Sequence, residues 1–256
     1  MSLIDFSTFS HELGNIQHQV YYLKNDGPPV IIIHELPGMN PECLDFGKRL
    51  VGDGFSVYLP LLFGKADKKA SGLRTLGHLF QICISREIYL FQLGKTSPVV
   101  SWLKSLCRRL NQEHNGKGVG VIGMCLTGGF AIPMMVEPSL MAPVLSQPSL
   151  PAGFSEASKQ DFACSAEDLE IAKERAANGT TIKAFRFDTD KISPQQRMES
   201  YQKEFGSALE YHCLKSDRQG EKGCHAVFTL DYFDDEGHPT REAYKILVGF
   251  FKEKLM

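Results

Sequence analysis

The residue with the clearest chemical potential is Cys125, at the centre of the run Gly-Met-Cys-Leu-Thr-Gly-Gly at 123–129. The apolar segment 118–122 before it is typical of a buried strand, and the residues after it can continue as a helix. A tight strand-to-helix turn strains the backbone of its central residue and projects that side chain from the sheet edge. Because Gly123 and Gly128 leave room for the turn, the pattern predicts a nucleophile elbow that presents a thiol.

Other polar side chains also follow predicted strands, at the carboxyl edge where the functional groups of a parallel sheet gather. They are His34, Glu35, Asp188, Asp190 and His225. A thiol nucleophile needs a base within reach and a carboxylate that orients the imidazole. The chain order of cysteine, aspartate and histidine therefore predicts a catalytic triad that includes Cys125.

Two members of this triad each have an alternative. The acid is Asp190 or Asp188, and the spacing to the following proline favours Asp190. The base is His225 or His238. The second histidine stands in Glu-Gly-His-Pro, which is typical of a turn into a helix, so we favour His225. His34 is typical of a histidine packed at the end of a strand.

The elements that position these residues alternate along the chain. We expect strands at 30–33, 55–60, 118–122, 142–145, 182–187 and 208–214, and helices at 41–51, 97–115, 165–178, 194–205 and 239–255. This alternation predicts an α/β fold, a mostly parallel twisted sheet with helices on both faces, in one domain spanning 1–256. Segments 64–93 and 151–164 do not fit the alternation and are typical of lids or pocket walls.

Composition excludes several classes of function. The 28 basic and 30 acidic residues are well mixed and give a net charge of −2, which argues against a nucleic-acid partner. Apolar runs fall short of the roughly 18 residues that span a membrane, and the N-terminus lacks the features of a signal peptide. The seven cysteines form no CxxC pair, so we expect reduced thiols and no zinc site. We expect a cytoplasmic monomer or small homo-oligomer without membrane partners.

With these residues in place, the chain resembles the dienelactone hydrolase family of α/β-hydrolases over residues 28–255. The likeness lies in the 123–129 run, in His-Glu-Leu-Pro-Gly-Met at 34–39, in Asp-Lys-Ile-Ser-Pro at 190–194, in Cys-His-Ala-Val-Phe at 224–228 and in Ser-Arg-Glu at 85–87. Thr127 stands where the elbow of the family usually has a small, glycine-like residue. The family's second carboxylate-binding arginine has no evident counterpart.

The resemblance implies the α/β-hydrolase fold and cleavage of a small-molecule ester or lactone through an acyl-enzyme, with no cofactor and no metal. In that case Cys125 is the nucleophile, Asp190 the triad acid, His225 the base, and Glu35 the hydrogen-bond partner of the resting thiol.

The resemblance further implies an oxyanion hole formed by the backbone N–H groups of Leu36 and Leu126, and a substrate contact from Arg86. Gln147 ends a predicted strand, and we expect it to line the substrate pocket. The elbow alone does not separate an esterase from a thioesterase, acyltransferase or peptidase. A small-molecule binder that has lost turnover is the non-enzymatic alternative.

Overall fold

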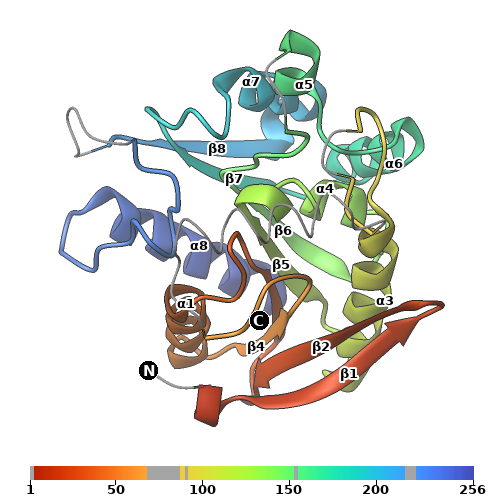
Figure 1. Ribbon diagram of the computed structural model, residues 1–256, viewed down its shortest axis with the longest axis vertical. Helices are drawn as coiled ribbons and strands as arrows, with labels where there is room; N and C mark the ends of the chain where they lie inside the picture. Colours follow the sequence, from red (N-terminus) through yellow and green to blue (C-terminus); the bar gives the residue numbers. More distant parts are fainter. Residues whose placement is uncertain (1–2, 68–86, 90–91, 153–154, 217–222) are drawn as a thin grey trace.

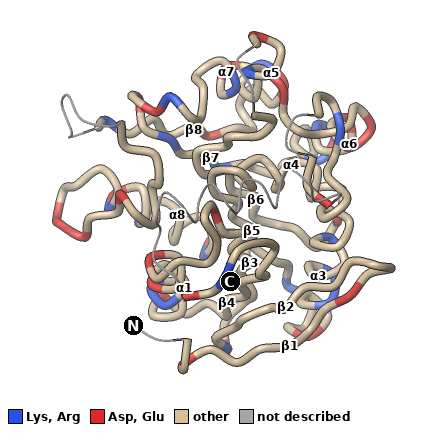
Figure 2. The backbone as a smooth tube through the Cα atoms, in the orientation of Figure 1, with Lys and Arg blue, Asp and Glu red and all other residues tan. Residues whose placement is uncertain are grey.

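The computed structural model describes residues 3–67, 87–89, 92–152, 155–216 and 223–256. Most of segment 64–93, which did not fit the predicted alternation, lies outside these residues. None of the helices in the described ranges is both long enough and apolar enough to cross a bilayer. Lysine, arginine, aspartate and glutamate are interspersed around the outside of the chain (Figure 2).

An eight-stranded sheet runs through the molecule in the order β1-β2-β4-β3-β5-β6-β7-β8 (Figure 1). Its strands are β1 (Ser7–Leu13), β2 (Ile16–Leu23), β3 (Pro29–Ile33), β4 (Ser56–Pro60), β5 (Val119–Met124), β6 (Leu140–Ser146), β7 (Ile182–Phe187) and β8 (Leu209–Leu214). The neighbours from β4 through β3 and β5 to β8 all pair in parallel. The predicted, mostly parallel sheet is therefore confirmed.

The antiparallel hairpin of β1 and β2 is an addition to the predicted sheet, and it joins through β2 to β4. Val20 is the only fully buried residue of the two strands, so the hairpin lacks a continuous apolar run. The two strands are joined through Gly14, whose φ is 60°, and Asn15. A glycine first in a two-residue connection is the sequence signal by which this hairpin can be found.

Helices cover both faces of the sheet (Figure 1). Their bounds are α1 (Pro41–Gly52), α3 (Pro98–Glu113), α4 (Ala131–Met134), α5 (Glu156–Gln160), α6 (Ala166–Ala177), α7 (Gln195–Phe205) and α8 (Pro239–Leu255). α1 and α8 pack on one face, and α3, α4, α6 and α7 pack on the other. The fold class is that predicted.

The central strand β3 shows why the sheet is buried on both sides. Ile31 and Ile33 belong to the core under α3, whereas Val30 and Ile32 belong to the core under α1 and α8. All four side chains are fully buried, and each contributes roughly 1.5–3 kcal/mol through the apolar surface that it removes from water. The strand ends at Ile33, which places the following polar residues at the carboxyl edge.

Two helix starts show how local sequence sets the boundaries. Ser165 caps α6, because its hydroxyl accepts a hydrogen bond from the backbone N–H of Asp168 at 3.2 Å. Ser97 occupies the corresponding position before α3, but its hydroxyl accepts from the N–H of Tyr89 at 3.0 Å instead.

Arg197 of α7 fixes the segment that follows β6. Its guanidinium donates to four backbone carbonyl oxygens at 2.6–3.0 Å, those of Pro148, Pro151, Ser158 and Asp161. The residue is only 1% exposed, and burial lowers its pKa. The carbonyl groups depend on this one side chain, since a buried acceptor without a donor is costly.

We expect Arg197→Met to lower the free energy of unfolding by about 3 kcal/mol, because several buried carbonyls lose their donor. Urea titration followed by circular dichroism measures this change. Lys173→Met on α6 is the matched control: Lys173 forms surface ion pairs with Glu170 and Glu204, and we expect a denaturation midpoint close to that of the wild type. Equal midpoints for the two variants would contradict the role given to Arg197.

Candidate active site

Cys125 lies where β5 passes into the single turn η2 (Cys125–Thr127), as the elbow pattern predicts. Its φ is 54°, in the left-handed region that residues with a side chain rarely adopt. Such strain persists only where the surroundings fix the backbone, and it is concentrated at functional sites. The carbonyl oxygen of Cys125 accepts hydrogen bonds from the N–H groups of Gly128 and Ser149, both at 2.9 Å, which fix this turn.

Two glycines make the turn possible. A Cβ at Gly123 would overlap the carbonyl oxygen of Thr127, and a Cβ at Gly128 would lie 2.5 Å from the carbonyl oxygen of Ser146. Both distances are shorter than real Cβ contacts, so the backbone requires glycine at both positions.

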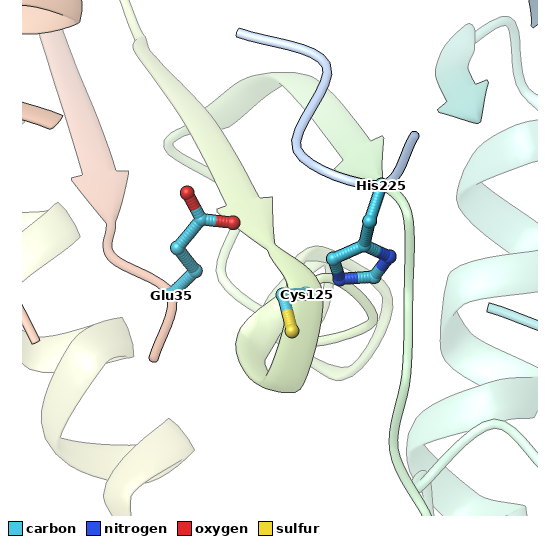
Figure 3. A group of neighbouring side chains, drawn as sticks. All are labelled: Glu35, Cys125 and His225. Carbon is cyan, nitrogen blue, oxygen red and sulfur yellow. The ribbon is translucent and has the colours of Figure 1, made fainter. Parts of the chain in front are cut away.

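His225 and Asp190 meet at the carboxyl edge of the sheet. Nδ1 of His225 lies 2.7 Å from Oδ2 of Asp190, whose side chain is 1% exposed. The other carboxylate oxygen accepts the N–H groups of Ile192 and Ser193 at 2.8 and 3.1 Å, so the carboxylate cannot turn away. Nε2 of His225 is buried without a hydrogen-bond partner in the described part of the chain, and Figure 3 shows a ring nitrogen on the side of Cys125.

The alternative residues lie in other surroundings. Asp188 is exposed, and its carboxylate accepts the backbone N–H of Ser216 at 3.0 Å. His238 is the N-cap of α8, and its Nδ1 lies 2.7 Å from the hydroxyl of Thr240. The structure therefore pairs His225 with Asp190 and leaves both alternatives outside this contact.

The electrostatics of His225 favour its protonated form. Burial of the ring acts to lower the pKa, but the electrostatic interaction with the sulfur of Cys125 and the hydrogen bond to Asp190 outweigh it. The pKa of His225 is consequently raised well above its ordinary value of 6.5. An imidazolium beside a cysteine stabilises the thiolate, which is the reactive form of the thiol.

His225 lies in the connection between β8 and α8, and we call its described part, residues 223–238, the histidine loop. The carboxylate of Asp231 accepts the backbone N–H groups of His225 and Ala226 at 2.8 and 2.9 Å. Sequence reasoning missed Asp231, although an aspartate that bonds nearby backbone N–H groups is a common turn device.

Arg49 of α1 holds the same loop through two contacts. Its guanidinium donates to the carbonyl oxygen of Phe228 at 2.6 Å and stacks 3.8 Å from the ring centroid of Tyr232. Arginine stacked on an aromatic face combines a charge with a flat contact, so both the backbone and a side chain of the loop are fixed.

Glu35 is 2% exposed, and three loops meet at its carboxylate. The hydroxyl of Thr229, from the histidine loop, donates to one oxygen, and the amide of Gln147, after β6, donates to the other at 3.3 Å. Burial raises the pKa of Glu35 despite these hydrogen bonds. Among the described residues Thr229 and Gln147 donate to this carboxylate, and the expected hydrogen bond from the thiol of Cys125 is not formed.

The ligating atoms of Glu35, Cys125 and His225 all lie within 4.8 Å of one another (Figure 3). Within the described ranges, this is the one group of three such side chains that is close enough to hold a metal ion. A set of one cysteine, one histidine and one carboxylate can bind zinc. The two oxygens of Glu35, however, are bound by protein donors.

Gln147 is bound at both ends of its side-chain amide. It has no exposed surface, its φ is 35°, and its side-chain oxygen accepts the hydroxyl of Ser146 while its amide donates to Glu35. It holds Glu35 in place. Its expected contact with substrate stays a prediction.

Leu36 and Leu126 lie at matching places beyond the ends of two neighbouring strands. β3 and β5 pair with Ile33 opposite Gly123, and each leucine is three residues beyond that pair. Leu126 is the second residue of η2, and the first N–H groups of a helical turn have no acceptor within it. Their joint role as an oxyanion hole stays a prediction.

His34 braces the loop that carries Leu36. Its Nε2 accepts the N–H of Leu62 at 3.2 Å, so Nδ1 carries the proton and donates to the carbonyl oxygen of Glu35 at 3.0 Å. The residue is fully buried, in agreement with a packing histidine at the end of a strand.

Arg86, the substrate contact implied by the resemblance, lies outside the described residues. A cavity of about 470 Å³ lies at the opposite edge of the sheet, between the start of β3 and the end of α3, where Pro28 and His114 line it. None of the candidate site residues contributes to that cavity.

Comparisons with solved structures find the same fold over nearly the whole chain. A dienelactone hydrolase from Anabaena variabilis is 11% identical, with a TM-score of 0.62, covering 98% of this chain and 100% of that one. A dienelactone hydrolase-like promiscuous phosphotriesterase from metagenomic libraries is 12% identical, with a TM-score of 0.65 and 98% of both chains covered. A thioesterase domain from the curacin biosynthetic pathway is 12% identical, with a TM-score of 0.56, covering 95% and 99%.

A search of curated proteins gives no significant match. The model of the dienelactone hydrolase family, in contrast, matches residues 18–215, which include the elbow and the Asp190 position. The chain therefore has the α/β-hydrolase fold and belongs to the dienelactone hydrolase family.

Proposed function

We propose that the protein cleaves an ester or lactone of a small molecule through Cys125, His225 and Asp190. The observation that carries this proposal is the 2.7 Å contact of His225 Nδ1 with buried Asp190, which leaves Nε2 unpartnered on the side of Cys125. A cysteine at a strained elbow next to an oriented imidazole is the arrangement that nucleophilic catalysis requires.

In the first step His225 accepts the proton of the Cys125 thiol, and the thiolate attacks the carbonyl carbon. The N–H groups of Leu36 and Leu126 stabilise the negative oxygen of the tetrahedral intermediate. The intermediate then collapses, the carbon–oxygen bond breaks, and the leaving alkoxide takes the proton from His225. The acyl group stays on Cys125 as a thioester; in a lactone the new hydroxyl remains attached to it.

In the second step a water molecule attacks the thioester and gives its proton to His225. The carbon–sulfur bond breaks, and the proton returns to the sulfur, which restores the thiol and releases the acid. Asp190 keeps the Nδ1 proton of His225 in place in both steps, so that Nε2 faces the reacting groups.

Glu35 contributes by remaining uncharged. An ionised carboxylate within 4.8 Å of the sulfur would oppose formation of the thiolate, and burial favours the neutral acid. We infer that Glu35 keeps its proton while Cys125 reacts.

Replacing the nucleophile tests the proposal directly. We expect Cys125→Ala to lower the turnover of p-nitrophenyl acetate by at least about 10⁴-fold, because no acyl-enzyme can form. Intact-mass spectrometry of the wild type with excess ester should show one added acyl group. Cys213→Ala, at an exposed thiol, is the control and should leave both results unchanged. Full activity in the Cys125 variant would refute the mechanism.

A panel of esters, lactones, thioesters and phosphotriesters, tested with the wild type, ranks the substrate classes.

Asparagine variants of the two aspartates distinguish an orienting effect of Asp190 on His225 from a general effect of negative charge. Asp190→Asn keeps an oxygen for Ile192 and Ser193 but places an amide N–H against Nδ1, which forces the wrong tautomer of His225. We expect kcat to fall by about 10³–10⁴-fold with little change in melting temperature. Asp188→Asn is the matched control and should stay near the wild type; the reverse ranking of the two variants would exchange their roles.

Glu35→Gln tests the proton on Glu35. The carboxyl titrates near its ordinary value of 4.5 when the chain is unfolded, and burial raises its pKa in the folded protein. The folded state then binds more protons than the unfolded state, so this contribution to stability is lost as the pH rises above 4.5. We expect the stability advantage of the wild type over E35Q to shrink in urea titrations as the pH rises above 4.5.

Glu242→Gln is the control for this titration. The hydrogen bond from Lys245 lowers the pKa of the exposed Glu242, so its contribution is lost as the pH falls, in the opposite sense. A difference between the wild type and E35Q that does not vary with pH would show that Glu35 is already ionised.

A further inference from the structure

The expected oxyanion donors, the N–H groups of Leu36 and Leu126, lie beyond the point where β3 and β5 are paired. The pairing of β3 with β5 ends at Ile33 opposite Gly123, and the chain continues from there to Leu36 on one side and to Leu126 on the other. Two donors stabilise one oxygen only if both lie about 3 Å from it. Beyond the last strand pair, some other contact must set their separation.

The side chain of Thr127 makes that contact. It is fully buried, and its hydroxyl oxygen lies 2.9 Å from the carbonyl oxygen of Ile33, 3.3 Å from that of His34 and 3.0 Å from that of Met124. The same oxygen accepts the backbone N–H of Met124 at 3.1 Å. One hydroxyl thus joins the end of β3 to the elbow.

Donor and acceptor capacities define what the hydroxyl can do. It has one proton, which it can give to one of the three carbonyls at a time, and Ile33 is the nearest. Its lone pairs remain for the N–H of Met124. A glycine at this position would offer neither group. The connection therefore depends on the side chain of Thr127.

We propose that Thr127 is a positioning residue that sets the distance between the N–H groups of Leu36 and Leu126, and thereby the geometry of the oxyanion hole. The inference rests on the proposed function and adds a residue to it. Thr127 follows Leu126 directly, and His34 lies two residues before Leu36, so the hydroxyl links the two donors by a short path on each side.

The nucleophile and its base also have contacts that do not involve Thr127. The backbone of Cys125 is fixed by the N–H groups of Gly128 and Ser149, and His225 is fixed by Asp190. Removal of the Thr127 hydroxyl should therefore leave the thiolate and its base in place while the N–H of Leu36 moves. This separation distinguishes a positioning role from a general loss of structure.

The test compares Thr127→Val, which keeps the shape but loses the hydroxyl, with Thr127→Ser, which keeps the hydroxyl. We expect T127V to lower kcat for p-nitrophenyl acetate by about 10- to 100-fold with KM nearly unchanged, because a displaced donor stabilises the transition state less well. T127S should stay within about threefold of the wild type. The rate of alkylation of Cys125 by iodoacetamide needs the thiolate but no oxyanion hole, and it should be unchanged in both variants.

Ser56→Ala is the matched control at the other end of the sheet. Ser56 is also fully buried, and its hydroxyl donates to the carbonyl oxygen of Asn25 at 2.6 Å and accepts the N–H of Asn25 at 3.0 Å. We expect S56A to lose stability as T127V does but to keep its kcat. Thr127→Ala carries the test if T127V does not fold.

Several results would overturn the inference. They are a T127V enzyme with the wild-type kcat, a T127S enzyme as slow as T127V, and an alkylation rate that falls in parallel with kcat. If the wild type turns over the ester and T127V matches it, only the role of Thr127 fails. If the wild type cleaves none of the substrates and forms no acyl adduct, both the proposed function and the role of Thr127 fail.

Discussion

The left-handed backbone at Cys125 is the constraint on which the rest of the site depends. A residue in this conformation costs roughly 1–3 kcal/mol, so the surroundings must offset that cost. The two glycines leave space, and two backbone N–H groups bind the carbonyl oxygen of Cys125. Both faces of β5 are closed by packed side chains, which keeps the strand from relaxing. The elbow is thus held by the sheet core as much as by its own sequence.

The loops around the elbow are joined to one another rather than to the elbow alone. Glu35 joins three of them, since its carboxylate binds Thr229 and Gln147. Asp231 and Arg49 hold the backbone of the histidine loop. Each of these contacts is buried or partly buried, so the geometry at the carboxyl edge is set by polar groups that exclude water. A displacement of any one loop is therefore transmitted to the others.

Much of this arrangement could be predicted from the sequence because its signals are local. β3 is a run of β-branched residues, and the elbow is marked by glycines around a cysteine. The spacing that favoured Asp190 over Asp188 agrees with the contact to His225. The polar hairpin of β1 and β2 was missed because its apolar residues do not recur at the two-residue spacing of a half-buried strand. The contact of Gln147 with Glu35 was not foreseen, because position after a strand does not tell whether a side chain meets a cavity or another side chain.

The anchoring by Arg197 has a consequence for how the protein can change. All four of its acceptors are main-chain carbonyls, which every amino acid supplies. Within residues 148–152 and 155–161, these four contacts therefore do not depend on which side chains the acceptor residues carry. Substitutions at the acceptor positions leave the main-chain carbonyl groups in place. The side chains of this segment can therefore vary in sequence while the main-chain anchor to α7 stays the same.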